Sequence, residues 1–132
     1  MPPFKAKAYV KEGCPFSFKY WLFMLEAELE HQIEVVRCDP EGPGFETVKA
    51  KLAQGLGKAT SFPTVEIEPG RYLSDSDALI NWYAERNEID AGGLPALQFY
   101  KETIFPQLLQ LHRGKSVSDR NGPRKRYRGR GI

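Results

Sequence analysis

Cysteine and histidine are scarce in this chain of 132 residues, and their scarcity excludes several classes of protein. The only cysteines, Cys14 and Cys38, cannot build a disulfide framework, and with only His31 and His112 beside them they predict no metal site. No apolar run approaches the roughly 20 residues of a membrane span, so we expect none. The chain also shows no secretory signal at its start, which favours the cytoplasm, or an organelle after removal of a targeting segment.

The formal net charge of +2 is unevenly distributed along the chain. Residues 1–112 carry 11 basic and 16 acidic side chains, a net charge of −5, whereas residues 113–132 carry eight basic side chains and one acid, a net charge of +7. This basic tail has almost no apolar content and therefore no reason to fold alone. Two partner classes suit it, namely a nucleic acid, with Tyr127 stacking on a base, and an acidic protein surface; a solvated chain end is the alternative.

Hydrophobic periodicity and turn residues predict an α/β fold. Alternating or β-branched segments predict strands at residues 5–11, 33–38, 64–68 and 71–73. Helical spacing predicts helices at residues 16–30 and 45–54, a third that begins near residue 74, and a fourth at 94–111 that Pro106 kinks or splits. The order βαβαββα gives a mixed four-stranded sheet flanked by helices. We therefore expect a domain at residues 1–90, an additional helical segment at 91–112 and the basic tail at 113–132.

Cys14 stands at the predicted turn between the first strand and the first helix. Pro15 suits the first helical turn, where its missing N–H is not needed. Unpaired N–H groups and the helix dipole favour an anion at such a position, so Cys14 is a candidate reactive thiolate, and an inert buried cysteine is the alternative. Cys38 ends the second strand at the same sheet edge; a buried cysteine is favoured there over a resolving thiol.

The predicted second half of the domain gives two further expectations. Ser74 and Asp77 have the spacing of a capping box, which places the start of the third helix at Ser74. Trp21, Trp82 and Tyr83 lie on apolar helix faces, so we assign all three aromatic side chains to the core.

Three segments together carry a resemblance to a known superfamily. They are KEGCPF at residues 11–16, SFPT at residues 61–64 and DSDAL at residues 75–79. In this order and at this spacing they resemble the thioredoxin-like fold, and more narrowly the glutaredoxins and the N-terminal domain of glutathione S-transferases. The resemblance covers residues 5–88. It implies that Lys11, three residues before Cys14, assists a cysteine that reacts with glutathione or with a glutathionylated substrate.

The same resemblance implies where glutathione binds. A cis peptide bond before Pro63 turns the backbone of Phe62 toward Cys14, so that its N–H and C=O pair with an extended peptide-like ligand. Asp75 takes the α-amino group of the γ-glutamyl end, and Ser76 takes its carboxylate. Helix capping without any ligand explains Asp75 and Ser76 equally well.

The sequence departs from these families in two ways. Ser17 stands where a dithiol glutaredoxin has its second cysteine, and only about 20 helical residues follow where a transferase has an all-helical second domain. The sequence predicts a glutathione-dependent thiol transferase or oxidoreductase acting through Cys14. The alternative is a non-catalytic thioredoxin-fold subunit or dimer anchored by its basic tail. A shared iron–sulfur cluster, as in monothiol glutaredoxins, is disfavoured because Pro15 replaces the glycine of their motif.

Overall fold

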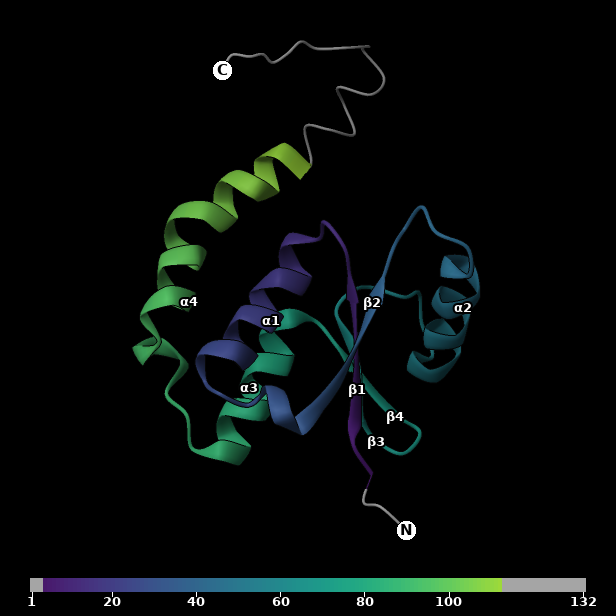
Figure 1. The fold of residues 1–132 in the computed structure, drawn as a ribbon, viewed down its shortest axis with the longest axis horizontal. Coiled ribbons are helices and arrows are strands. Elements are labelled where there is room, and N and C mark those ends of the chain that lie inside the picture. The colour runs from purple at the N-terminus through teal and green to yellow at the C-terminus, as the bar shows by residue number, and fades with distance from the viewer. Residues whose placement is uncertain (1–3, 113–132) are drawn as a thin grey trace.

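Four strands form one mixed sheet in the computed structural model, which describes residues 4–112 (Figure 1). The basic tail at residues 113–132, with Tyr127, lies outside the described residues. The elements of the sheet and its helices are β1 (Ala6–Lys11), α1 (Pro15–Glu26), β2 (Ile33–Cys38), α2 (Phe45–Leu56), β3 (Thr64–Glu68), β4 (Arg71–Ser74) and α3 (Ser76–Asn87). This is the predicted βαβαββα order, and the fold is thioredoxin-like.

The strand order β2-β1-β3-β4 brings the segments that contain the candidate site residues to one edge of the sheet. β1 and β2 are parallel and pair Lys11 with Cys38, so both strands end at this edge. β3 is antiparallel to β1 and pairs Thr64 with Tyr9, so it begins there. β4 is antiparallel to β3 and pairs Ser74 with Thr64, so it ends at this edge too. The β1–α1 turn, the segment before β3 and the start of α3 therefore meet.

Helices cover both faces of the sheet, with α1 and α3 on one face and α2 on the other (Figure 1). The main core lies on the α1 and α3 face and includes the buried side chains of Phe23, Val65 and Leu79. Tyr83 is buried in it as predicted, but Trp21 and Trp82 are only half-buried at its margin. Trp82 instead packs its ring under the Arg86 guanidinium, 3.8 Å from the ring centroid.

A further helical segment follows α3 and packs against α1. It consists of a short turn, η2 (Ala91–Gly93), helix α4 (Pro95–Phe99), a π-helical turn, η3 (Tyr100–Ile104), and a final helical stretch at residues 105–112. The sequence predicts that Pro106 kinks or splits this helix. Within the π turn the Phe105 N–H donates to the Tyr100 carbonyl, and this wider turn lets the chain stay helical past a residue that has no N–H to donate.

Two predicted element ends were wrong. The first helix ends at Glu26 rather than near residue 30, because Glu28 takes a left-handed conformation with φ 60° despite its helix propensity. The capping box of Ser74 and Asp77 does not form, since Ser74 belongs to β4. Asp75 is the N-cap of α3 instead, and its carboxylate accepts hydrogen bonds from the N–H groups of Asp77 and Ala78. No helix within residues 4–112 has the length and apolar character needed to cross a bilayer.

Candidate functional site

The β1–α1 turn places Cys14 at the N-terminus of α1. Gly13 has a φ of +80°, which suits glycine, and the turn closes when the Cys14 N–H donates to the Lys11 carbonyl at 3.2 Å. Cys14 is the N-cap residue and Pro15 occupies the first turn, as predicted. The Cys14 side chain is 8% exposed, so its sulfur is largely shielded from bulk water.

The first turn of α1 leaves unpaired backbone N–H donors beside Cys14. It contains no acidic side chain, and no side chain within residues 4–112 caps its free N–H groups. These unpaired donors and the helix dipole therefore leave a partial positive charge beside the Cys14 sulfur. A thiolate or a bound carboxylate at this position would satisfy the donors.

The segment before β3 lies against Cys14. The Phe62–Pro63 peptide bond is cis, as predicted, and the Pro63 side chain is fully buried. The Cys14 sulfur lies 3.9 Å from the Phe62 carbonyl oxygen, and the Lys11 ammonium lies 5.9 Å from the centroid of the Phe62 ring. The structure thus brings together Lys11, Cys14 and Phe62, which the sequence had placed up to 51 positions apart.

Two cavities meet at Cys14 and Lys11. The larger has a volume of about 810 Å³ and lies among β1, α1, the β2 edge and the final helical stretch, with an apolar wall that includes Trp21, Val35 and Leu108. The smaller has a volume of about 300 Å³ and lies on the α2 side. Its lining combines three basic side chains with aromatic and hydroxyl groups, and the basic ones are Lys11, Lys49 and His112. Cys14 therefore faces a large apolar space and a small basic one.

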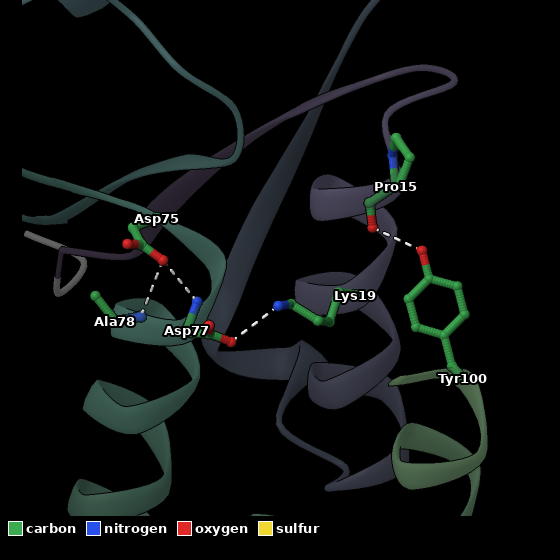
Figure 2. A network of polar contacts seen from close by, with 6 residues as sticks. All are labelled: Pro15, Lys19, Asp75, Asp77, Ala78 and Tyr100. Carbon is green, nitrogen blue, oxygen red and sulfur yellow. Dashed lines mark hydrogen bonds and ion pairs between the residues drawn. The ribbon is translucent and has the colours of Figure 1, made fainter. Parts of the chain in front are cut away.

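Asp75 and Ser76 lie at the start of α3 and line neither of these two cavities. The Asp75 carboxylate accepts from the Asp77 N–H at 2.9 Å and from the Ala78 N–H at 3.5 Å (Figure 2). Ser76 is only 3% exposed. Capping thus occupies one carboxylate oxygen of Asp75, and the binding of glutathione by both residues stays a prediction.

Polar contacts that the sequence did not reveal fix α1 from two sides (Figure 2). The Lys19 ammonium is nearly buried, 2.9 Å from the Asp77 carboxylate on α3 and 4.5 Å from the Phe105 ring centroid. The Tyr100 hydroxyl donates to the Pro15 carbonyl at 2.7 Å. Burial, followed by the nearby charge of Cys14, raises the pKa of Tyr100 to about 12. In the sequence, Tyr100 lies on the apolar stripe of the predicted helix at residues 94–111, which indicates burial. No neighbouring residue indicates that its hydroxyl binds the Pro15 carbonyl.

Cys38 differs from Cys14 although both belong to the same sheet edge. Its side chain is buried beside Tyr9 and Leu52 and lines neither cavity. Burial, with a smaller contribution from the negative charge of Glu12, raises the pKa of the Cys38 thiol. These features match the predicted buried cysteine.

Two further features bear on thiol and metal chemistry at this edge. The Ser17 hydroxyl, which stands in the place of a second thiol, accepts a hydrogen bond from the backbone N–H of Lys11 at 3.0 Å. Within the described part of the chain, no group of three or more metal-ligating side chains occurs.

Comparison with known proteins gives one family and several related folds. The family model of the glutathione S-transferase N-terminal domain matches residues 13–86. Glutaredoxin 2 from Salmonella typhimurium, solved in complex with glutathione, aligns with a TM-score of 0.52 at 14% identity over 89% of this chain and 70% of that one. No curated protein matches the sequence.

Two other solved structures align with lower TM-scores. A possible glutathione S-transferase from Rhodopseudomonas palustris aligns with a TM-score of 0.46 at 22% identity over 62% of this chain and 40% of its own. Glutathione transferase Omega 2C from Trametes versicolor aligns with a TM-score of 0.45 at 18% identity, over 77% of this chain and 43% of that one. The chain thus spans less than half the length of either.

Proposed function

The chain belongs to the family of the glutathione S-transferase N-terminal domain, and from this membership we propose that it binds glutathione and transfers it between thiols through Cys14. One observation carries the proposal. Cys14 stands at the uncapped N-terminus of α1 and lines both cavities together with Lys11. This is where a thiolate is favoured and where a peptide-like ligand has room.

The proposed reaction uses one protein thiol and two glutathione molecules. The Cys14 thiolate attacks the glutathione sulfur of a mixed disulfide, the bond to the substrate sulfur breaks, and that sulfur leaves as a thiolate and takes up a proton. Cys14 is then disulfide-bonded to glutathione. A glutathione thiolate attacks the glutathione sulfur of this bond and releases the Cys14 thiolate and glutathione disulfide. The substrate sulfur is reduced to a thiol, one free glutathione thiol is oxidised and joins the glutathione of the mixed disulfide as glutathione disulfide, and Ser17 leaves no second protein thiol at this motif to compete.

The proposed ligand positions follow the sheet edge. The pairing of Thr64 with Ser74 makes the chain leave β4 beside the point at which it enters β3, so Phe62 and the start of α3 adjoin. The Phe62 backbone, set by Pro63, would pair with the cysteinyl part of glutathione. The start of α3, with Asp75 and Ser76, would bind the γ-glutamyl end, because helical N–H groups suit a carboxylate.

The test is the reduction of a glutathionylated peptide by the wild type, Cys14→Ser and Cys38→Ser. We expect Cys14→Ser to lose about 100-fold or more of the rate, because it removes the nucleophile. Cys38→Ser should stay within about twofold of the wild type, because Cys38 lines neither cavity. Equal rates for the wild type and Cys14→Ser would overturn the proposal.

A second candidate is a non-catalytic subunit of an assembly. Large apolar side chains on the terminal helical segment are exposed, with Phe99 61% and Leu111 69% accessible. In this case the basic residues 113–132 would anchor the subunit to a protein or a nucleic acid. Deleting residues 113–132 should then abolish co-purification of the partner, and Cys14→Ser should leave it intact; unchanged association after the deletion would dismiss this candidate.

A further inference from the structure

The first turn of α1 is held from one side by two aromatic residues of the terminal segment. The Tyr100 hydroxyl donates to the Pro15 carbonyl at 2.7 Å (Figure 2), and the Tyr100 ring meets Phe18 edge-on, with 4.9 Å between the ring centroids. The Phe105 ring meets Phe16 edge-on at 5.3 Å. The terminal segment thus contacts this turn through one backbone carbonyl and two aromatic rings.

The π-helical turn brings Tyr100 and Phe105 to the same face of the terminal segment. In an ordinary α-helix, residues five positions apart differ by about 140° around the axis, so only one of the two would face α1. In the structure the Phe105 N–H donates to the Tyr100 carbonyl, and the two ring centroids lie 5.6 Å apart. Such turns are rare and occur frequently at functional sites. Here the turn aligns both aromatic side chains with the start of α1.

The sheet domain holds the same turn of α1 from the other side. The Ser17 hydroxyl accepts from the Lys11 N–H at 3.0 Å, and the nearly buried Lys19 ammonium pairs with the Asp77 carboxylate at 2.9 Å. The Phe105 ring also covers Lys19, with 4.5 Å between the ammonium and the ring centroid. Every one of the first five residues of α1 therefore contacts another part of the molecule.

The orientation of this turn decides what surrounds the Cys14 sulfur. Because Pro15 has no N–H, the free backbone donors nearest the N-cap belong to Phe16 and Ser17, the two positions from which an N-cap side chain accepts. These N–H groups stabilise an anion only when they are directed at it. Cys14 is 8% exposed, so little bulk water is at hand to replace them if the turn rotates or frays.

We propose that Tyr100 and Phe105 are positioning residues that fix the first turn of α1 with its free N–H groups directed at the Cys14 sulfur. The inference rests on the proposed function only in taking Cys14 as the reacting thiol. Neither aromatic side chain takes part in the reaction, and both act through the turn that they hold. The terminal segment, which supplies no reacting group, thereby sets the reactivity of the nucleophile.

The test is the rate at which iodoacetamide alkylates Cys14 at pH 7, in a Cys38→Ser background that leaves Cys14 as the only thiol. Tyr100→Phe removes the bond to Pro15 and keeps the ring. We expect it to slow alkylation about 3- to 10-fold, because fewer directed N–H groups stabilise the reacting thiolate. Tyr20→Phe is the matched control on the same helix, since its hydroxyl has no partner among the described residues, and it should leave the rate within about twofold.

A second pair of variants tests the aromatic contact. Phe105→Leu removes the ring that meets Phe16 and covers Lys19, and we expect it to slow alkylation about 2- to 5-fold. Phe99→Leu, at an exposed side chain of the same segment, should leave the rate unchanged. Both pairs retain the charged and titratable side chains that line the cavities beside Cys14, which are Lys11, Glu12, Arg37, Lys49 and His112.

The direction of the change separates positioning from a purely structural role. Because Cys14 is largely buried, a variant that only loosened the fold would expose the sulfur and speed alkylation. Faster or unchanged alkylation in Tyr100→Phe would therefore overturn the inference. If Cys14 is the nucleophile of glutathione transfer, Tyr100→Phe should also lower kcat for the glutathionylated peptide about 3- to 10-fold, with KM within about twofold.

The alkylation assay contains no glutathione, so the two proposals can fail separately. If Cys14→Ser transfers glutathione as fast as the wild type while Tyr100→Phe slows alkylation, the proposed function fails and the positioning role stands. If Cys14→Ser loses transfer while Tyr100→Phe alkylates at the wild-type rate, the positioning role fails and the proposed function stands.

Discussion

The sheet domain and the terminal helical segment contribute different things to the same site. Residues 6–87 supply the sulfur of Cys14, the helix N-terminus behind it and the Phe62 backbone. Residues 91–112 supply no reacting group, yet Leu108 and His112 line the two cavities and Leu97 enters the main core. In the function proposed above, the first region holds the reacting thiol, and the second shapes the space around it.

The two regions are joined mainly through α1. The Glu26 carboxylate at the end of α1 accepts from the N–H groups of Ala96 and Leu97, both at 2.7 Å. The Tyr100 hydroxyl donates to Pro15 at the start of α1. Both ends of the helix that carries Cys14 are therefore attached to the terminal segment. If these hydrogen bonds stabilise the protein, removing them should also lower the free energy of unfolding of the sheet domain.

The largest effect is expected from Leu97→Ala. The Leu97 side chain is fully buried in the core shared by the two regions. Its loss should lower the free energy of unfolding by about 2–5 kcal/mol in urea denaturation, because it leaves a cavity. Leu111→Ala, at a side chain 69% exposed, should change it by less than about 0.5 kcal/mol. If both variants unfolded like the wild type, the terminal segment would not belong to the cooperative unit.

Glu26→Gln should have the next largest effect. Helix α4 begins after Leu94, which has no capping side chain, and the distant Glu26 carboxylate caps it instead. The amide keeps one acceptor oxygen but loses the charge, so we expect a loss of about 1 kcal/mol. Glu85→Gln, on the exposed face of α3, is the control and should be neutral. Faster proteolysis at residues 88–94 in Glu26→Gln alone would locate the loss at the junction.

The sequence predicts the sheet domain better than the terminal segment, and the reason is the range of the interactions. Strands 33–38 and 64–68 are predicted with the observed bounds because β-branched composition, in the first, and alternation, in the second, are local signals. The cysteine at a helix start and the proline before β3 are local signals too. By contrast, Glu26 caps a helix 70 residues away, and Tyr100 meets a carbonyl 85 residues away. No local pattern encodes such pairs.

The same difference holds within the candidate site. Lys11, Cys14 and Phe62 could be assigned because each belongs to a recognisable segment. The position of His112 beside the smaller cavity depends on the path of the whole terminal segment past α1, and this segment includes a π-helical turn before Pro106. The left-handed Asp75, with φ 83°, replaced the expected cap Ser74 because β4 continues through Ser74.

Tyr100→Phe should cost about 1 kcal/mol at neutral pH, the net contribution of one hydrogen bond. Only the neutral phenol donates to Pro15. The pKa of Tyr100 is raised from 10 to about 12 in the folded protein, so its contribution is complete below pH 10 and is lost as the pH rises toward 12. Unfolding of the wild type and Tyr100→Phe between pH 7 and 12 measures this. A difference that stayed constant to pH 12 would contradict the assignment.

The smallest effect, and one of opposite sign, is expected from Tyr20→Phe. The Tyr20 side chain is fully buried between α1 and α3, and its hydroxyl has no hydrogen-bond partner among the described residues. Burial, followed by the nearby Tyr83 hydroxyl, raises the pKa of Tyr20, but the two hydroxyls do not form a hydrogen bond of ordinary geometry. Removing an unpaired buried hydroxyl should leave the free energy of unfolding unchanged or raise it by up to about 1 kcal/mol.

Both substitutions remove a tyrosine hydroxyl, Tyr20→Phe inside the sheet domain and Tyr100→Phe at its junction with the terminal segment. Urea denaturation of the two variants therefore compares the same chemical change in the two places. A loss in Tyr20→Phe as large as that in Tyr100→Phe would mean that the Tyr20 hydroxyl does have a partner, for which the Tyr83 hydroxyl is the nearest candidate. The two regions would then no longer differ in how their buried hydroxyls are satisfied.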